Sequence, residues 1–528
     1  MAVETSAELP ATDETPPRRR RPSLDAGLAT LFGAAAIVIG LIWRSVPLPG
    51  DPWSYVRAAH DFPGQHWNAV GYARYGLILP LVALERVFSI SQATEYTLPL
   101  ISAAVCAAFV YLLVRLRVGR WAAIGAAALT IGNSLVGLTL TRVYPDLPST
   151  AVMVVAVYLA LLAADKGRAD PGMSRSLLIL LLGVGFFVGL SYEIRETVIF
   201  EWPIIAYLLL RYVGWRRAAA PVVLPAVGWL VTELLINHFA HGDAFVRLRA
   251  LTGADIAGNG VAQDQAYLGH GRLHYLVLIP RTMLHHYDLA PLLAIGAVAL
   301  VGGIVYRGTT GLLTVWAALA AGGLIIFGGV LHPAHPSIRQ DIERYWIAFE
   351  IPMFMAASAA AAQTARLVGG RLKAVRTPGR PRVIAAALVT VVLLAWPLAA
   401  FGRWLGTTET LAPNGGNAME MLRGYLTNAL PKAPAPEATI WTSSYTKRLL
   451  QFYDRGPFGG PRWKAHVHVL DTANPPATGD WIVMIDHGTC TFCVRGMSPW
   501  TFGKSARTDQ WSVAWKAPQD NVVVYRQG

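Results

Sequence analysis

Residues 26–43 form the uncharged stretch AGLATLFGAAAIVIGLIW, which lies between Asp25 and Arg44. About 17–25 predominantly apolar residues are needed to cross the hydrocarbon core of a bilayer as a helix. Similar charge-free gaps separate Glu95 from Arg115, Arg120 from Arg142, Asp146 from Asp165, Arg175 from Glu193, Asp288 from Arg307, Arg307 from Arg339 and Arg382 from Arg403. Three further apolar segments each admit one acid: 197–210 with Glu201, 218–237 with Glu233 and 345–365 with Glu350. Because lipid offers no partners for exposed backbone groups, these segments predict about eleven transmembrane helices in an all-α polytopic bundle.

The overall composition agrees with a membrane protein. Of the 528 residues, 54% are hydrophobic and 15% are charged, whereas soluble domains carry about 25% charged residues. The first apolar run is longer than the 7–15 residues of a signal-peptide core, and no small-residue cleavage site follows it. We therefore expect it to remain as a membrane span. The polar residues 1–22, rich in Pro, Thr and Glu, are expected to form a disordered cytoplasmic tail.

The chain has a net charge of +13, and the positions of its basic residues follow the membrane topology. If the N-terminal tail is cytoplasmic, the basic residues gather in alternate loops, which are the cytoplasmic ones: 115–120, 166–175, 211–217, Arg307 and 366–382. This asymmetry obeys the positive-inside rule. It predicts a multi-pass protein of the cell (cytoplasmic) membrane, with its N-terminus inside and its C-terminus outside. No nucleic-acid partner is needed to explain the charge.

Three regions on the non-cytoplasmic side are too large to be simple turns. Within the membrane domain, residues 23–404, they are the loops 46–95 and 238–288; the third region is residues 405–528. The first loop is predicted to hold a short helix from Asp51 to about Phe62 and an interfacial helix over 75–90. The C-terminal region predicts a small extracytoplasmic α/β domain. Its strands are expected at 438–442, 465–470, 481–486, 511–515 and 521–525, and its helix at 445–453.

The cysteines do not define a metal site. Cys106 lies within an apolar span and is expected to be a small buried residue. Cys490 and Cys493 fall on the predicted non-cytoplasmic side, where disulfides persist. Two cysteines cannot complete a four-ligand zinc site, so a disulfide, two free thiols and redox or metal chemistry stay open in that order of preference.

The strongest candidate for chemistry follows the first span directly. Residues 50–59 are GDPWSYVRAA, and an Asp-Pro pair is a common helix start, with Asp51 as the N-cap and Pro52 at the first helical position. The structural role and a catalytic carboxylate are compatible, because a cap would fix the side chain in place. The sequence contains no Walker loop, no dinucleotide motif after a strand and no nucleophile elbow.

Several short motifs share one order and one predicted side of the membrane. They are D-x-x-x-Y-x-x-A from Asp51, R-Y-G-x-x-x-P-L over 74–81, Tyr144-Pro145-Asp146, Arg195-Glu196-Thr197 and Arg344-Tyr345. Together with a soluble domain after the last span, this pattern resembles the GT-C superfamily of membrane glycosyltransferases. More narrowly, it is similar to the protein O-mannosyltransferase and aminoarabinose-transferase branch, known as the glycosyltransferase family 39-like branch.

The resemblance implies transfer of a sugar from a polyprenyl-phosphate donor to an extracytoplasmic acceptor (a protein, a glycan or a glycolipid), with inversion. The attacking hydroxyl needs a carboxylate base, and the departing phosphate needs arginine or a metal. The carried-over roles give Asp51 the base and make Asp146 a second acid. Arg195 and Arg344 are the first candidates for binding the phosphate, and Arg74 and Arg142 are the second. The same motifs add Tyr55, Glu196 and Tyr345 as substrate-binding residues.

Other features of the membrane region have two interpretations each. Any one arginine at the end of a span could simply extend to water. Glu201, close to Arg195 and to Pro203, could line a substrate cavity or pair with a neighbouring arginine. His332 and His335 could ligate a metal, but the prolines beside them favour a structural role in a Pro-rich loop. The sequence holds no complete ligand set, so a divalent metal stays open and no other cofactor is expected.

Two other functions compete with sugar transfer. A transporter or lipid flippase would also be polytopic with charges inside the membrane, but no internal repeat is present and the polar residues gather at one interface. A non-catalytic envelope scaffold would not need Asp51 or Asp146. The glycosyltransferase hypothesis requires that Asp51, Asp146, Arg195 and Arg344 share one cavity. The sequence identifies neither the sugar nor the acceptor nor the polyprenyl length.

Overall fold

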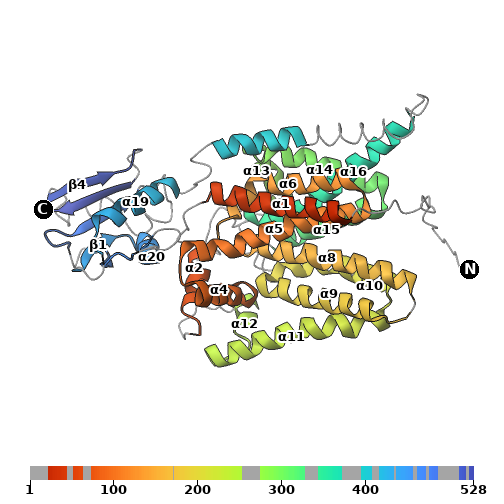
Figure 1. Cartoon of the computed structure of the whole chain (residues 1–528), viewed down its shortest axis with the longest axis horizontal. Helices are drawn as coiled ribbons and strands as arrows, with labels where there is room; N and C mark the ends of the chain where they lie inside the picture. The colour runs from red at the N-terminus through yellow and green to blue at the C-terminus, as the bar shows by residue number, and fades with distance from the viewer. Residues whose placement is uncertain are drawn as a thin grey trace, which may run out of the picture.

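The computed structural model is a mostly helical bundle joined to a small C-terminal sheet domain (Figure 1). It describes residues 22–44, 51–63, 73–170, 172–252, 274–327, 343–371, 394–406, 416–432, 436–452, 454–455, 461–470, 475–485, 510–518 and 522–528. Cys490, Cys493, His332 and His335 lie outside these ranges, so their predicted roles stay untested.

The bundle consists of long apolar helices that run side by side (Figure 1). Its elements are α1 (Pro22–Ile42), α5 (Gln92–Arg117), α6 (Arg120–Ile131), α7 (Ser134–Thr139), α8 (Asp146–Ala169), α9 (Arg175–Ile194), η1 (Glu196–Glu201), α10 (Trp202–Tyr212), α11 (Trp215–His241), α14 (Ala290–Tyr306), α15 (Gly308–Phe327), η3 (Glu343–Trp346) and α16 (Ile347–Arg371). Within the described residues, seven helices are long and apolar enough to cross a membrane, and shorter apolar helices accompany them. Within the described residues, each predicted span contains helix, the last one over residues 394–406.

The third predicted span is not one continuous helix. It breaks at Gly132, and Asn133 caps the next helix by accepting hydrogen bonds from the backbone N–H of Leu135 at 2.7 Å and of Val136 at 3.1 Å. The Asn133 amide also donates to Glu350 Oε2 at 3.2 Å. The break therefore supplies a partner for a fully buried acid of α16, which explains why a polar residue interrupts the apolar run.

Two helices of the first large loop, α2 (Asp51–His60) and α4 (Tyr75–Phe88), lie at the end of the bundle next to the C-terminal domain (Figure 1). They share an apolar cluster that includes Val56, Leu77 and Ile78. A Cβ at Gly76 would lie 2.8 Å from Ile194 Cγ1, so the glycine allows α4 to approach the end of α9. The second large loop contributes α12 (Val246–Thr252) and α13 (His274–His285).

Glu85 on α4 is an 8% exposed acid whose Oε1 has no hydrogen-bond partner among the described atoms. Burial raises its pKa to about 7, against opposition from Arg86. Because the folded-state pKa lies above the ordinary 4.5, the folded chain binds the extra proton, and stability falls as the pH rises from about 4.5 to about 7. We expect Glu85→Gln to stabilise the protein on the order of 2 kcal/mol at pH 8 and hardly at all at pH 4.5, as measured by thermal unfolding. A constant gain across this pH range would contradict the burial argument.

The C-terminal domain contains a five-stranded sheet with the order β2-β1-β3-β5-β4. The strands are β1 (Ala438–Thr442), β2 (Ala465–Val469), β3 (Trp481–Ile485), β4 (Trp511–Lys516) and β5 (Val522–Gln527), with helices α19 (Gly416–Ala429) and α20 (Ser444–Phe452). β1 pairs in parallel with β2 and β3, whereas β5 pairs antiparallel with β3 and β4. All five strands and α20 were expected from the sequence. The amphipathic α19, which buries Leu422 and Leu426, was not.

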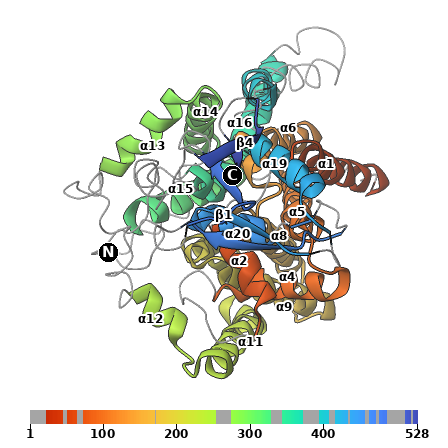
Figure 2. The same cartoon turned by 90° about the vertical axis from the view of Figure 1, so that its left-hand side faces the viewer.

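The C-terminal domain is attached to the helix that begins at Asp51. Trp53 of α2 donates from its indole N–H to the carbonyl oxygen of Arg448 at 3.1 Å, and the Arg448 guanidinium lies 4.8 Å from the centre of the Trp53 ring. Arg423 of α19 donates to the Gln92 side chain at the start of α5. Figure 2, which looks at the molecule from the side of this domain, shows α20 in front of α2.

Candidate active site

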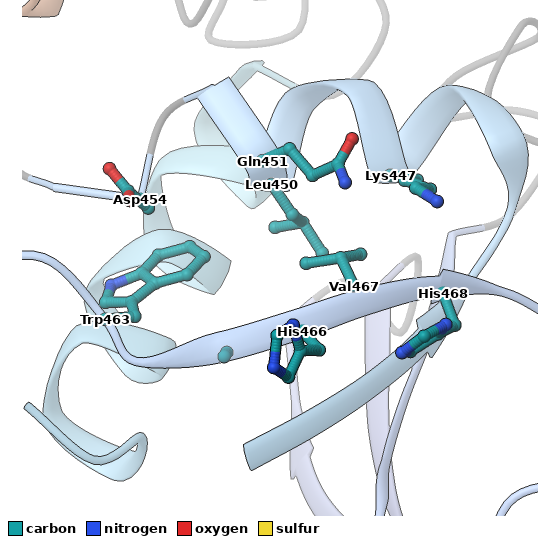
Figure 3. Close-up of a pocket in the computed structure, with 9 residues that line it drawn as sticks. Lys447, Leu450, Gln451, Asp454, Trp463, His466, Val467 and His468 are labelled. Atoms are coloured by element: carbon teal, nitrogen blue, oxygen red, sulfur yellow. The ribbon is translucent and has the colours of Figure 1, made fainter. Parts of the chain in front are cut away.

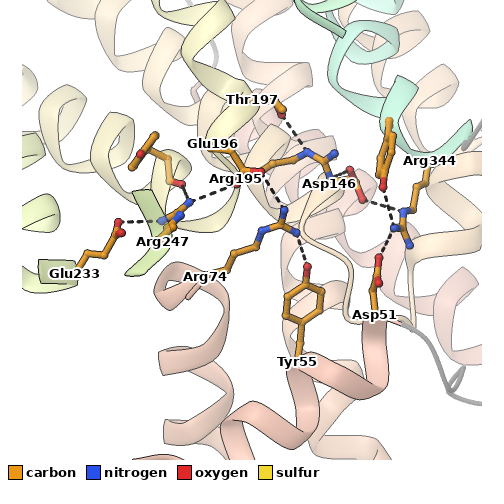
Figure 4. Close-up of polar contacts among 12 residues, drawn as sticks. Asp51, Tyr55, Arg74, Asp146, Arg195, Glu196, Thr197, Glu233, Arg247 and Arg344 are labelled. Atoms are coloured by element: carbon orange, nitrogen blue, oxygen red, sulfur yellow. Dashed lines mark hydrogen bonds and ion pairs between the residues drawn. The ribbon is translucent and has the colours of Figure 1, made fainter. Parts of the chain in front are cut away.

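Four charged side chains from distant parts of the chain meet in one place (Figure 4). Arg344 donates to Asp51 Oδ2, and its Nε lies 3.6 Å from Asp146 Oδ2. Arg195 in turn donates to Asp146 Oδ1. The two acids and the two arginines are thus linked in one chain of ion pairs.

Local sequence explains how α2 and α8 present the acids. Both helices begin at an aspartate next to a proline. In α2, Pro52 fits the first turn and restrains the residue before it. In α8, Pro145 is the N-cap, and its ring fixes its own φ. Asp51 opens α2, and Asp146 opens α8 directly after Pro145. A carboxylate in the first turn also interacts favourably with the helix dipole. Tyr55 lies four residues after Asp51, which places both side chains on the same face of α2.

Arg195 lies at a break between two helices. It is the C-cap of α9, with the extended backbone angles φ −154° and ψ 122°, and η1 follows it. Pro203 lies at the second position of α10, where its missing backbone N–H costs no helical hydrogen bond. The extended residue turns the Arg195 guanidinium toward Asp146 and lets its Nε donate to Thr197 Oγ1 at 3.0 Å.

A third arginine extends the ion-pair chain on the side of α4. Arg74, the N-cap of α4, donates to the Tyr55 hydroxyl and lies 3.1 Å from Glu196 Oε1. The Tyr345 ring packs against Arg195 and Arg344. Its centre is 4.4 Å from the Arg195 guanidinium and 5.1 Å from that of Arg344. The structure therefore brings Tyr55, Arg74, Glu196 and Tyr345 to the predicted pair of acids.

Sequence reasoning missed Arg247, which extends the series of ion pairs into the bundle. It comes from α12 in the second large loop, and its side chain is 3% exposed. It lies 2.9 Å from Glu233, 3.3 Å from Glu193 and 3.4 Å from Glu196. The available signal was indirect: a buried acid such as Glu233 requires a cation, but nothing in the sequence shows that the cation comes from a loop.

We expect Arg247→Gln to destabilise the fold strongly, because it leaves three buried carboxylates without their shared cation. Removing one partner of a buried ion pair costs about 3–5 kcal/mol. Thermal unfolding in lipid nanodiscs measures the loss, and the double variant with Glu233→Gln should recover part of it. The control is Arg249→Gln in the same helix, where the arginine side chain is 59% exposed. Equal stability of the two arginine variants would show that the Arg247 network is not a structural centre.

Exposure separates the two aspartates. The side chain of Asp146 is 2% exposed, whereas that of Asp51 is 55% exposed although it contacts Arg344. Partial desolvation opposes ionisation of Asp51, but Arg344, with Arg74 and Arg195 farther away, outweighs it and holds the Asp51 pKa below its ordinary 3.8. Asp51 is therefore an ionised carboxylate that a substrate can reach, and Asp146 is enclosed behind it.

Two predicted residues stand apart from the ion-pair chain. Arg142 is buried and lies within electrostatic range of Arg344. Glu201 accepts from the Trp316 indole N–H of α15 at 2.6 Å, so its partner is a tryptophan rather than the arginine considered from the sequence.

The acids of the site pair with arginines rather than with one another. Among the residues that the structure describes, no three His, Cys, Asp or Glu side chains are grouped to hold a metal ion. The arrangement instead offers several guanidinium groups for an anion. Arginine suits phosphate because its planar group can form two parallel hydrogen bonds.

Comparison with known proteins places this geometry in a family context. Residues 82–237 match the family model of dolichyl-phosphate-mannose-protein mannosyltransferase. The fold is similar to that of ArnT from Cupriavidus metallidurans bound to undecaprenyl phosphate, with a TM-score of 0.59 and 13% identity over 95% of this chain and 98% of that chain. The apo state of the same protein has a TM-score of 0.55 and 12% identity over 96% of this chain and 98% of that chain. A comparison with curated proteins finds no match.

The match covers the region from α4 to α11, which supplies Asp146, Arg195 and Glu196. The structural likeness extends over the bundle and the C-terminal domain alike. The chain is a multi-pass membrane protein that is similar over residues 82–237 to dolichyl-phosphate-mannose-protein mannosyltransferases and in its fold to ArnT.

Proposed function

We propose that the chain transfers a sugar from a polyprenyl-phosphate donor to a hydroxyl group of an extracytoplasmic acceptor, with inversion at the anomeric carbon. The observation that carries the proposal is the position of Arg344, which contacts Asp51 and lies 3.6 Å from Asp146. A guanidinium that can bind a phosphate thus lies beside Asp51, the more exposed of the two aspartates. The undecaprenyl phosphate named for the ArnT structure supports a donor of this class.

In the proposed reaction, the acceptor oxygen attacks the anomeric carbon from the face opposite the phosphate. The new carbon–oxygen bond forms as the bond to the phosphate oxygen breaks, and the acceptor proton passes to Asp51. The bonding electrons leave with the polyprenyl phosphate, whose growing negative charge Arg344 and Arg195 stabilise. Asp146 holds these two guanidinium groups in place from its enclosed position.

The contact between Arg344 and Asp51 gives the site an order of events. Without donor, the arginine is held by the base. A donor phosphate competes for the same guanidinium and releases the carboxylate. Losing that cation raises the pKa of Asp51, so donor binding would strengthen the base at the moment when it is needed.

The sidedness of the reaction is part of the proposal. The alternation of basic loops along the sequence supports an N-terminus inside the cell membrane and a C-terminal domain outside. The site lies at the end of the bundle next to that domain (Figure 1). Donor, acceptor and soluble domain would then meet on the extracytoplasmic side.

The test uses the purified chain in lipid with a panel of polyprenyl-phosphate sugars. We expect at least one donor to be converted to polyprenyl phosphate and a glycosylated hydroxyl, and NMR of the product to show the opposite anomeric configuration to that of the donor. Products that retain the configuration would rule out the single displacement, and transport of the intact lipid without cleavage would favour a flippase.

A further inference from the structure

The C-terminal domain contains a cavity that the proposed chemistry does not use. It lies between α20 and the edge strand β2 and has a volume of about 410 Å³ (Figure 3). Pockets that hold small molecules range over about 300–1,000 Å³. The lining residues are Lys447, Leu450, Gln451, Asp454, Trp463, Ala465, His466, Val467 and His468.

The cavity has an apolar part that is fixed in place. Leu450 and Val467 are buried, and their side chains approach each other between α20 and β2 (Figure 3). Trp463 is 6% exposed, and its indole N–H donates to Thr427 Oγ1 at 3.2 Å. A hydrogen-bonded ring of this kind offers a rigid surface for the C–H face of a ligand.

The polar part is mixed rather than strongly charged. Lys447 supplies an ammonium group, Asp454 a carboxylate and Gln451 an amide. Asp454 has its own cations at 3.7 Å in Arg462 and at 3.9 Å in Arg455, and His466 pairs with Glu437. Because charges of both signs lie side by side in and around the lining, neither a phosphate nor a cation meets a surface of one opposite charge. The complement of such a surface is an uncharged ligand with many donors and acceptors.

We propose that this cavity binds a neutral saccharide unit of the acceptor. The planar amide of Gln451 can form hydrogen bonds to two neighbouring hydroxyls, while the apolar part covers the less polar face of a sugar ring. The inference rests on the proposed function, because it makes the acceptor a glycan or a glycosylated molecule.

The location of the cavity connects it to the base. Helix α20 contributes Lys447, Leu450 and Gln451 to the cavity and Arg448 to the contact with Trp53. Trp53 lies two residues after Asp51 on α2. An acceptor held against α20 is therefore bound to the element that is attached to the catalytic helix.

The experiment measures binding by the full chain in nanodiscs without donor, so that it does not depend on turnover. Saturation-transfer NMR is recorded with neutral manno-, gluco-, galacto- and arabino-oligosaccharides. We expect at least one series to bind and Gln451→Ala to weaken it about fivefold through one lost hydrogen bond. The control is Gln510→Ala, which removes the same type of side chain just before β4, at the opposite edge of the sheet, and should leave binding unchanged.

Two results would overturn the saccharide site. One is the absence of binding by every oligosaccharide, or binding that neither Gln451→Ala nor Lys447→Ala alters. The other is an extended peptide that binds instead and loses affinity in Gln451→Ala. Sugar transfer without saccharide binding would reject this site alone, whereas saccharide binding without transfer would reject the proposed reaction and keep the site.

Discussion

Asp51→Asn should lower kcat for sugar transfer about 10²–10⁴-fold, the usual contribution of a general base. Asparagine retains the size of the side chain at the start of α2, but it cannot accept the proton of the attacking hydroxyl. Because Arg344 and its neighbours hold the pKa of Asp51 below 3.8, the wild-type carboxylate is ionised throughout the neutral range. The acid limb of kcat/KM, which reports the free enzyme, should therefore lie below pH 3.8. Release of polyprenyl phosphate from a labelled donor measures both effects.

The matched control is Asp61→Asn at the other end of the same helix. Asp61 is 44% exposed and pairs at 3.0 Å with Arg57, a surface ion pair of little energetic weight. It should transfer sugar at close to the wild-type rate. Wild-type turnover by Asp51→Asn would remove this residue from the mechanism, and equal losses in the two variants would indicate damage to α2 rather than to the chemistry.

Arg344→Lys should lower kcat/KM about 10²–10³-fold even though the positive charge is kept. The guanidinium reaches Asp51 and Asp146 with different nitrogens, whereas an ammonium is a single point of charge. Loss of one group that stabilises a developing charge costs about this factor. Donor titration of the initial rate should show a fall in kcat with a rise in KM, because the arginine serves both the bound phosphate and the departing one.

Arg86→Lys on α4 provides the comparison for an arginine in the same region. Its side chain is exposed and donates to the Phe62 carbonyl oxygen at 3.4 Å, so the exchange should have little effect. A wild-type kcat/KM in Arg344→Lys would show that the phosphate is bound elsewhere, with Arg195 and Arg74 as the next residues to exchange.

The bundle was predictable because its signal is thermodynamic and local. Runs without charge must be helical in lipid, and the spans at 146–165 and 175–193 coincide with α8 and α9. The start of α2 was equally accessible, since Asp-Pro is a helix-start signal with a steric cause. The C-terminal strands followed from alternating apolar residues between prolines.

What the sequence could not provide was distance between elements. Arg344 meets Asp51 across 293 residues, and only the resemblance of short motifs suggested the encounter. Arg247 lies in a loop segment with no periodic pattern, so its burial among three acids was invisible. The interruption of the third span at Gly132 also depends on a tertiary partner, Glu350, because the apolar composition alone favours an unbroken helix.

The central claim is that a donor phosphate binds where Arg344 bridges the two aspartates. A cryo-electron microscopy structure of the full chain in nanodiscs with a polyprenyl phosphate tests it most directly. We predict the phosphate oxygens at hydrogen-bonding distance, about 2.7–3.2 Å, from the Arg344 guanidinium. We also predict that Asp51 no longer contacts that arginine and faces the position that the donor sugar would occupy. A phosphate bound away from Arg344 and Arg195, with the Arg344–Asp51 contact still intact, would contradict the account.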